Sequence, residues 1–164
     1  MLRITKFLFA AFIFAAMQFS TPTLAKPMTV GPEKCGKCHR DEAKVWKDTR
    51  HFKSFKTVHK HKTAKKILKA VGEKRMKRSA ICATCHYTTV ENKGKMKPVA
   101  GTSCESCHGN ASEWISLHND YGGPGAKRAS ETPEHKAARL EKSKAAGMIH
   151  SSMLYEIAEN CMSC

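Results

Sequence analysis

The sequence is poor in the side chains that build an ordinary hydrophobic core. Aromatic residues make up only 7% of the 164 residues, with two tryptophans and three tyrosines, and long aliphatic runs are few beyond residue 25. A folded domain must bury enough apolar surface to offset the conformational entropy that it loses. The composition therefore argues against a large core made of side chains alone.

Acidic residues are also scarce. Only 14 Asp and Glu accompany 29 Lys and Arg, and the formal net charge is +15. The densest basic run, residues 60–78, contains no aromatic side chain on which a base could stack, so we predict no nucleic-acid partner. Attraction of an acidic protein partner and a solvated helix face remain open as interpretations. The run contains Lys60, Lys62, Lys65, Lys66, Lys69, Lys74, Arg75, Lys77 and Arg78, with Glu73 as its one acid.

No apolar run is long enough to span a bilayer. The longest covers residues 7–17, which is 11 residues, whereas a transmembrane helix needs roughly 20. Arg3 and Lys6 lie near its start, and Thr23-Leu-Ala25 offers small residues for cleavage. These features predict a signal peptide at residues 1–25 and one exported, periplasmic domain at residues 26–164 without stable membrane insertion; an uncleaved anchor is the alternative. The first 34 residues contain no cysteine, which argues against a lipid-attached N-terminus.

No cysteine lies outside a C-x-x-C pair. Three of the four pairs are followed directly by histidine, and C-x-x-C-H is the attachment signature of c-type haem. Two thiols bond to the porphyrin and the adjoining imidazole binds iron. We therefore predict a multihaem cytochrome with three haems c. The motifs are Cys35-Gly-Lys-Cys38-His39, Cys82-Ala-Thr-Cys85-His86 and Cys104-Glu-Ser-Cys107-His108, and the fourth pair is Cys161-Met-Ser-Cys164.

Two other interpretations of the cysteines are weaker. Four pairs could form two zinc sites, but zinc binding gives no reason for a histidine after each of the first three pairs. A disulfide scaffold commonly closes long loops between distant cysteines, whereas the cysteines here lie in close C-x-x-C pairs.

The fourth pair lacks a histidine, so we expect it to bind haem only if a histidine follows Cys164. The chain is then a fragment or a frameshifted form of a longer cytochrome; the alternative is a protein with three haems.

Each six-coordinate iron needs a second axial ligand. Six histidines remain outside the motifs, and this excess favours bis-histidine ligation, although one methionine ligand stays open. His51 lies on the aromatic face of a predicted helix, and His118 follows His108 by ten residues. Of His59 and His61, which face different directions on a helix, we expect only one to bind iron. The remaining candidates are His135 and His150.

The pattern predicts a mainly helical fold. Its short helices and loops wrap around closely packed covalent haems, with at most one small hairpin. Apolar residues recur at helical spacing, and Thr, Pro and Gly mark helix ends. The predicted helices run from Asp41 through Phe55, from Ala64 to Val71 before Gly72, from Thr132 to Gly147, and from Ser151 or Ser152 into the last cysteine pair; residues 87–99 form the hairpin and residues 119–125 a glycine-rich loop.

The surroundings of the motifs resemble the tetrahaem cytochrome c-554 family, typified by the electron acceptor of hydroxylamine oxidoreductase. The resemblance covers most of residues 33–164 and rests on the first motif with Trp46-Lys-Asp-Thr-Arg-His51, on residues 101–109, and on residues 158–164. It implies helices around closely packed, mostly bis-histidine haems in a periplasmic carrier. It also implies that His51 is a distal ligand, and that one haem can have an open axial position, which in this family is linked with small nitrogen oxides.

Two functions follow as expectations. The first is transfer of single electrons between redox partner proteins, which we expect to be acidic. The alternative is an enzyme that reduces nitrite, hydroxylamine or nitric oxide at a five-coordinate haem, with nearby histidine or lysine supplying protons.

Overall fold

The computed structural model describes residues 27–163. The predicted signal peptide at residues 1–25 and the last cysteine, Cys164, lie outside the described residues.

Short helices and one small sheet make up the described chain. The mainly helical prediction with at most one hairpin is confirmed. The α-helices are α2 (Pro32–Gly36), α3 (Arg40–Asp48), α4 (Arg50–Thr57), α5 (Ala64–Ala70), α6 (Ala80–His86), α7 (Cys104–His108), α8 (Ile115–His118), α9 (Pro133–Ala145) and α10 (Leu154–Met162); the 3-10 helices are η1 (Val58–Lys60), η2 (Met76–Arg78) and η3 (Arg128–Ser130); the strands are β1 (Thr88–Asn92) and β2 (Lys95–Ala100).

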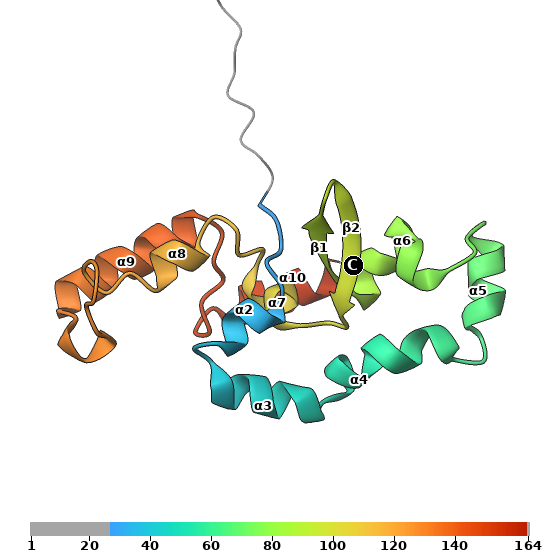
Figure 1. The fold of residues 1–164 in the computed structure, drawn as a ribbon, viewed down its shortest axis with the longest axis horizontal. Coiled ribbons are helices and arrows are strands. Elements are labelled where there is room, and N and C mark those ends of the chain that lie inside the picture. Colours follow the sequence, from blue (N-terminus) through green and yellow to red (C-terminus); the bar gives the residue numbers. More distant parts are fainter. Residues whose placement is uncertain (1–26, 164) are drawn as a thin grey trace, which may run out of the picture.

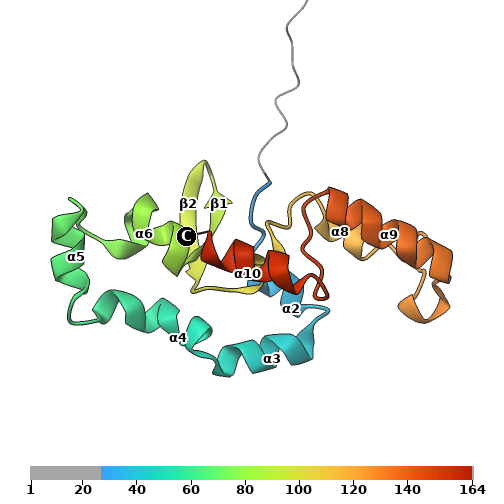
Figure 2. The same ribbon diagram turned by 180° about the vertical axis from the view of Figure 1, so that it is seen from behind.

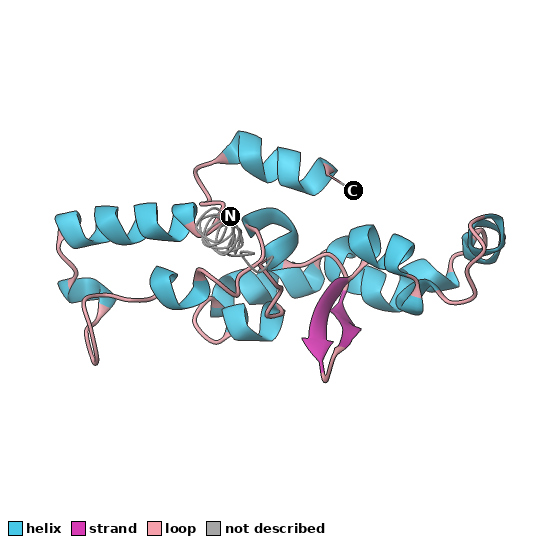
Figure 3. Cartoon of the chain, turned by 90° about the horizontal axis from the view of Figure 1, so that it is seen from above, coloured by secondary structure: helices cyan, strands magenta, loops and turns pink. Residues whose placement is uncertain are grey.

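The helices are arranged around a central group formed by α2, α7 and α10 (Figure 1). From this group α3, α4 and α5 follow one another around the periphery, and α6 leads back to the hairpin. Helices α8 and α9 pack together as a lobe at the opposite end. The view from behind shows α10 crossing the central group (Figure 2), and in the view from above α10, the helix that ends at the C label, lies to one side of the other elements (Figure 3).

The prediction of one helix from Asp41 through Phe55 is wrong, because the chain breaks between α3 and α4. Thr49 has an extended backbone, with φ −78° and ψ 163°. Its hydroxyl donates to the Trp46 carbonyl at 2.6 Å and accepts from the Phe52 N–H at 3.3 Å. One side chain thereby ends α3 and caps α4. The residue before the first turn of α3 is His39, not Asp41.

Other predicted boundaries agree closely with the structure. Helix α5 ends before Gly72, which has φ +73°. The Thr132 hydroxyl accepts from the His135 N–H at 3.2 Å at the start of α9, and Gly147 follows its end with φ +98°. The C-terminal helix begins slightly later than expected, since Met153, not Ser151 or Ser152, is its N-cap. The glycine-rich loop lies between α8 and η3, as predicted.

The hairpin holds the third motif in place. Its two strands are antiparallel and join at Lys93 and Gly94, whose φ angles of 51° and 73° suit a tight two-residue turn. At the other end the buried Thr88 hydroxyl donates to the Gly101 carbonyl at 2.9 Å and lies 2.7 Å from the hydroxyl of Ser103. Ser103 is the N-cap of α7. The predicted hairpin is therefore present, and it fixes the start of the helix that carries the third motif.

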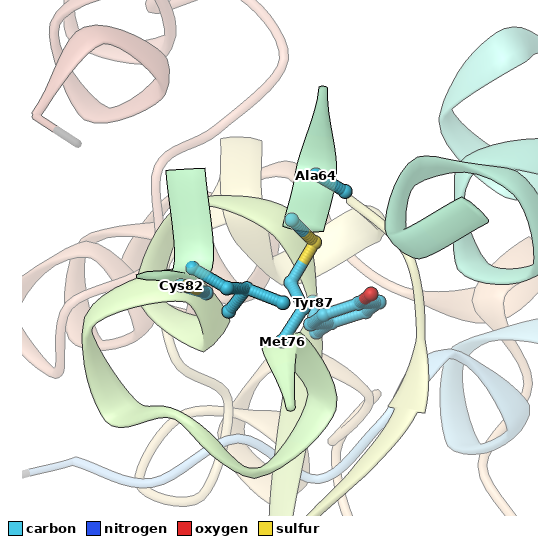
Figure 4. Close-up of a cluster of buried hydrophobic side chains, with 5 residues drawn as sticks. Ala64, Met76, Cys82 and Tyr87 are labelled. Carbon is cyan, nitrogen blue, oxygen red and sulfur yellow. The ribbon is translucent and has the colours of Figure 1, made fainter. Parts of the chain in front are cut away.

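Two small clusters contain all the buried apolar side chains of residues 27–163 except Ala100. The first includes Cys82 of the second motif and combines α5, η2 and α6 (Figure 4). The second lies between α8, α9 and the segment that follows α9. The first cluster consists of Ala64, Leu68, Met76, Cys82 and Tyr87, and the second of Ala111, Trp114 and Met148. Neither approaches the size of a single core for a domain of this length.

Several large apolar side chains lie on the surface near the motifs. Val45 on α3 is 68% exposed, Ile81 beside Cys82 is 65% exposed, and Leu154 and Tyr155 on α10 are 74% and 77% exposed. Monomeric proteins rarely leave large apolar patches uncovered without a function for them. Within residues 27–163, no helix has both the length and the apolar composition needed to cross a membrane.

Candidate haem-binding sites

Each complete C-x-x-C-H motif occupies about one helical turn. In the first, the His39 N–H donates to the Cys35 carbonyl at 2.9 Å, and Cys38 donates to the same oxygen at 3.2 Å. Side chains three residues apart on a helix lie on one face, so both thiols of a motif are available to one edge of a haem. Helix α2 contains Cys35, with Cys38 and His39 just after it; α6 contains Cys82, Cys85 and His86; α7 contains Cys104, Cys107 and His108.

The first and third motifs lie side by side. Helices α2 and α7 are in contact, and the thiols of Cys35 and Cys104 are close enough to shift each other's pKa. The neighbouring Cys104 is the main reason why the pKa of Cys35 rises above its ordinary value, followed by burial, and the neighbouring Cys35 is the main reason why the pKa of Cys104 falls to about 7. The two predicted attachment points are thus adjacent in space, as closely packed haems require.

Cys161, the first cysteine of the fourth pair, approaches the third motif. Helix α10 packs against α7, and the Asn160 side chain donates to the Ser106 carbonyl at 2.9 Å. Burial raises the pKa of Cys107, and the neighbouring Cys161 raises it further. The first and third cysteine pairs and Cys161 therefore meet in the central group of helices.

A buried carboxylate holds this centre together. Glu105 lies between the cysteines of the third motif and is 2% exposed. Its oxygens accept from the N–H groups of Val30 at 2.9 Å, Gly31 at 2.8 Å and Ala111 at 2.9 Å. Sequence reasoning missed this role. The only signal for it is an acid inside a motif, where haem attachment requires none.

Two histidines from distant parts of the chain face each other. His39 follows the first motif, and His118 ends α8. Their Nε2 atoms are 3.5 Å apart, their ring centres are 5.8 Å apart, and their planes differ by 15°. The difference between the two distances is about two ring radii, so the imidazoles point at each other end to end. Two metal–imidazole bonds of about 2.0 Å each would span a similar gap.

His118 is half-buried, and its surroundings keep the ring uncharged. Trp114 meets the ring edge-on at 5.7 Å between centres, and the Nδ1 atom is buried without a hydrogen-bond partner. Burial lowers the pKa of His118, and the nearby His39 and Arg139 lower it further. A neutral imidazole is the form that binds iron.

His108 is oriented by a carbonyl. Its Nδ1 atom lies 2.8 Å from the Ile149 oxygen, which can only accept, so Nδ1 carries the proton and Nε2 is free to bind a metal. The Ile149 N–H donates back to the His108 carbonyl at 2.9 Å. The segment after α9 therefore fixes the ring of the third motif.

The second motif lies apart from the others, in the first apolar cluster. Its Cys82 is buried with Tyr87, whose pKa is raised by burial and whose hydroxyl is buried without a partner. The Lys77 ammonium lies 3.5 Å from the centre of the Phe55 ring. Burial lowers the pKa of His59, and the charge of the nearby Lys77 lowers it further. The Nδ1 atom of His59 is buried without a hydrogen bond.

Two of the candidate ligands are engaged in local turns. The Nδ1 atom of His61 accepts from the Thr63 N–H at 3.4 Å and contacts the Thr63 hydroxyl at 2.8 Å. His150 does the same with Ser152, at 3.3 Å and 2.9 Å. A ring that accepts at Nδ1 carries its proton on Nε2 when neutral, which is unsuited to binding iron through Nε2.

The other predicted ligands are distributed over the surface. His51 on α4 and His86 at the end of α6 are exposed. The Nδ1 atom of His135 lies 2.8 Å from an oxygen of Glu131, just before α9.

The described residues fit covalent haem. Paired thiols stand on three helical turns, two imidazoles meet end to end, and buried ring nitrogens of His59 and His118 have no protein partner. Within residues 27–163, no three His, Cys, Asp or Glu side chains are gathered as a metal-ion site would need.

A basic groove lies beside the second motif. It has a volume of about 420 Å³ and runs between η2 and the hairpin. No acidic side chain is among the residues that line it, which are Lys77, Arg78, Asn92, Lys95, Met96, Lys97 and Pro98. Lys77 and Arg78, at the end of the basic run of residues 60–78, therefore lie beside Lys95 and Lys97 of β2.

Comparison with known proteins gives matches in one family. Residues 34–109, which contain all three complete motifs, match the family described as cytochrome c554 and c-prime. Over 117 residues the chain is 32% identical to cytochrome c-554 of Nitrosomonas europaea. This match covers 66% of the chain and 50% of that protein, so the chain spans about half the length of the curated relative. No solved structure matches the chain significantly.

Proposed function

Because both matches support a cytochrome c-554-like family for this chain, as its sequence predicted, we propose that it carries single electrons between redox partner proteins through several covalent haems. The observation that carries the proposal is the end-to-end pair of His39 and His118, with Nε2 atoms 3.5 Å apart. His39 and His118 together would hold an iron with no free position for a substrate, which suits electron transfer better than catalysis at the metal.

The cysteine pairs and their histidines would hold three haems, with His39, His86 and His108 as proximal ligands. When bound, each haem supplies an iron that alternates between two oxidation states. The contact between Cys35 and Cys104 supports close packing of the first and third groups. A fourth group at Cys161 and Cys164 depends on a histidine after Cys164.

The spare histidines differ in how well they suit iron. His118 is opposite His39. His59, with its unpartnered buried Nδ1 beside the second motif, is a better ligand than His61, whose Nδ1 accepts from a main-chain N–H. The same argument disfavours His150. His51 remains a candidate because of its place after Trp46 in the family resemblance.

The proposal includes export: residues 1–25 would act as a signal peptide, and the mature chain would work in the periplasm. Covalent attachment of haem to C-x-x-C-H occurs outside the cytoplasm, so the motifs and the apolar leader are consistent with each other.

The partners are proposed to be acidic proteins that dock at the basic groove and the adjoining residues 60–78. The groove has four cationic side chains and no acid among its lining residues, and it lies beside the motif that contains Cys82. Carrier complexes are small and transient, so charge would act mainly on the rate of encounter.

A reductase of nitrite, hydroxylamine or nitric oxide is the second candidate, and two side chains near the second motif favour it. Around the second motif, Lys77 has a pKa lowered by burial, and the Tyr87 hydroxyl has no partner. Both can donate a proton to a small ligand.

The test of electron transfer starts from protein exported with its haems attached. Intact mass and haem staining after denaturing electrophoresis should give three covalent haems, and electron paramagnetic resonance should give wholly low-spin iron. In stopped-flow mixing with a soluble electron acceptor, all the haems of the reduced protein should become oxidised. A mass without haem adducts contradicts the proposal, and a large high-spin fraction with nitrite-dependent oxidation favours the reductase.

A further inference from the structure

The lobe that carries His118 contains a buried ion pair. Arg139 on α9 is 7% exposed, and the side chain of Glu131, which precedes α9, is 3% exposed. Replacing a buried ion pair by apolar residues is often neutral or stabilising. A buried ion pair in a molecule with so small a core therefore suggests a role other than stabilising the fold.

The arginine uses three nitrogens in two directions. Its Nε donates to Glu131 Oε1 at 2.6 Å, and its Nη2 donates to Glu131 Oε2 at 2.7 Å. The remaining nitrogen, Nη1, donates to the main-chain carbonyl of His118 at 2.6 Å. The guanidinium also lies over the Tyr121 ring, at 5.0 Å from its centre. Glu131 thus fixes the guanidinium, and the guanidinium fixes the end of α8.

His118 needs such a support more than His108 does. The ring of His108 is oriented directly, because its Nδ1 is bonded to the Ile149 carbonyl. The Nδ1 of His118 has no hydrogen-bond partner, so no polar contact at Nδ1 sets the angle of that ring. Its position depends on the edge of Trp114 and on the main chain that Arg139 holds.

We propose that Arg139, held by Glu131, is the positioning residue that keeps the His118 imidazole opposite His39. The inference rests on the proposed function, since it assigns His118 an iron to bind. Lysine cannot reproduce the arrangement, because one ammonium on a flexible stem cannot bind a carboxylate with two parallel bonds and a separate carbonyl at once.

The test compares Arg139→Lys and Arg139→Gln with Glu131→Gln and His118→Ala in the haem-loaded protein. His118→Ala should convert one haem fully from low-spin to high-spin by electron paramagnetic resonance. The two arginine variants and Glu131→Gln should each give a partial high-spin signal of the same haem, and added imidazole should restore the low-spin form. The matched control is Lys144→Gln, which breaks an exposed ion pair with Glu141 on the same helix and should keep the wild-type spectrum.

The outcomes separate the two claims. If His118→Ala changes one haem while Arg139→Lys and Glu131→Gln keep the wild-type spectrum, the positioning role is overturned and the ligand assignment stands. If His118→Ala has no effect on any haem, the ligand assignment that the inference rests on fails. Should Arg139→Gln not accumulate, the comparison of Arg139→Lys with Glu131→Gln still decides, because each keeps part of the buried pair.

Discussion

Glu105 accepts a hydrogen bond at 2.8 Å from the main-chain N–H of Gly31, which lies 74 residues earlier in the chain. The same carboxylate accepts from Val30 and Ala111. One acid inside a cysteine motif therefore joins the start of the described chain to the third motif and to the loop that leads into α8.

Replacement of Glu105 by glutamine should destabilise the protein. An amide presents a donor where the carboxylate accepts, so at least one buried N–H loses its partner, at a cost of about 1–3 kcal/mol. Chemical denaturation followed by circular dichroism measures the change. Glu113→Gln, at an exposed acid in the same region, is the matched control and should be neutral. Equal stability of the two variants would contradict the role of Glu105.

Alanine at Gly109 should cost more than alanine at Gly125. Both glycines have φ +80°, which is unfavourable for L-residues, and Gly109 combines it with ψ 157°, a region that is essentially restricted to glycine. A Cβ at Gly109 would also clash with the Gly147 carbonyl, whereas a Cβ at Gly125 meets open space. The difference between the two thermal midpoints therefore reports the clash together with the backbone strain at Gly109. Similar midpoints would mean that the contact between residues 109 and 147 relaxes easily.

His59→Ala and His61→Ala form a pair with opposite expectations. Loss of His59 should turn one low-spin haem high-spin, because its buried Nδ1 atom has no hydrogen-bond partner and the preceding residue, Val58, packs against the cluster that contains Cys82. Loss of His61 should leave the spectra unchanged, because its Nδ1 caps a turn at Thr63. Electron paramagnetic resonance distinguishes them, and the reverse result would assign the ligand to His61. The His51→Ala variant tests the remaining expectation in the same way.

Stability should respond to acid through Glu131. Hydrogen bonds from Arg139, together with its charge and that of His135, lower the pKa of this carboxyl from 4.5 to about 2. A lowered folded-state pKa contributes stability that is present above pH 4.5 and is lost as the pH falls toward 2. The difference in thermal midpoint between wild type and Glu131→Gln should therefore be largest at neutral pH and shrink between pH 4.5 and 2. A constant difference across that range would indicate that the charge is unimportant.

Salt should slow electron transfer to an acidic partner. Raising the ionic strength to physiological values shortens the screening length to about 8 Å, which weakens attraction by the basic groove. Charge reversal of Lys95 and Lys97 together should slow the reaction as well, and so should reversal at Lys65, Lys66 and Lys69. The haem spectra should be unchanged in both sets of variants.

Reversal of Lys136 and Lys142, exposed on α9 at the other end of the molecule, is the control. Rates that ignore salt and the reversals would leave these lysines as solvated surface.

Local signals in the sequence predicted the local structure well. Thr132 with Pro133, and Gly147, mark the two ends of α9 because capping and positive φ depend on neighbouring residues only. The break at Thr49 was not predicted, because threonine also occurs within helices. In the structure its hydroxyl hydrogen-bonds to the Trp46 carbonyl before it and to the Phe52 N–H after it. The C-x-x-C-H pattern located the haem motifs, and apolar residues at helical spacing predicted the helical class.

Pairings over long separations could not be predicted. The approach of His118 to His39 spans 79 residues, and spacing along the chain carries no information about it. The role of Arg139 depends on that pairing and on Glu131, so it was equally hidden. The hydrogen bonds that set His61 and His150 apart from His59 involve turn geometry that histidine and a following hydroxyl residue form only in the folded chain.

The anchoring of residues 27–31 has a consequence for the order of folding. Pro27 and Met28 bond to Asn110 and Ser112, over 83 and 84 residues, and Val30 and Gly31 bond to Glu105 over 75 and 74 residues. Contacts of such high sequence separation close a large loop, whose entropy must be lost before they give any stability, and they slow folding. Residues 27–31 therefore cannot be anchored until the chain around the third motif has reached them. The helices between them, α3 to α6, and the hairpin can form beforehand, so the centre of the molecule is assembled after its periphery.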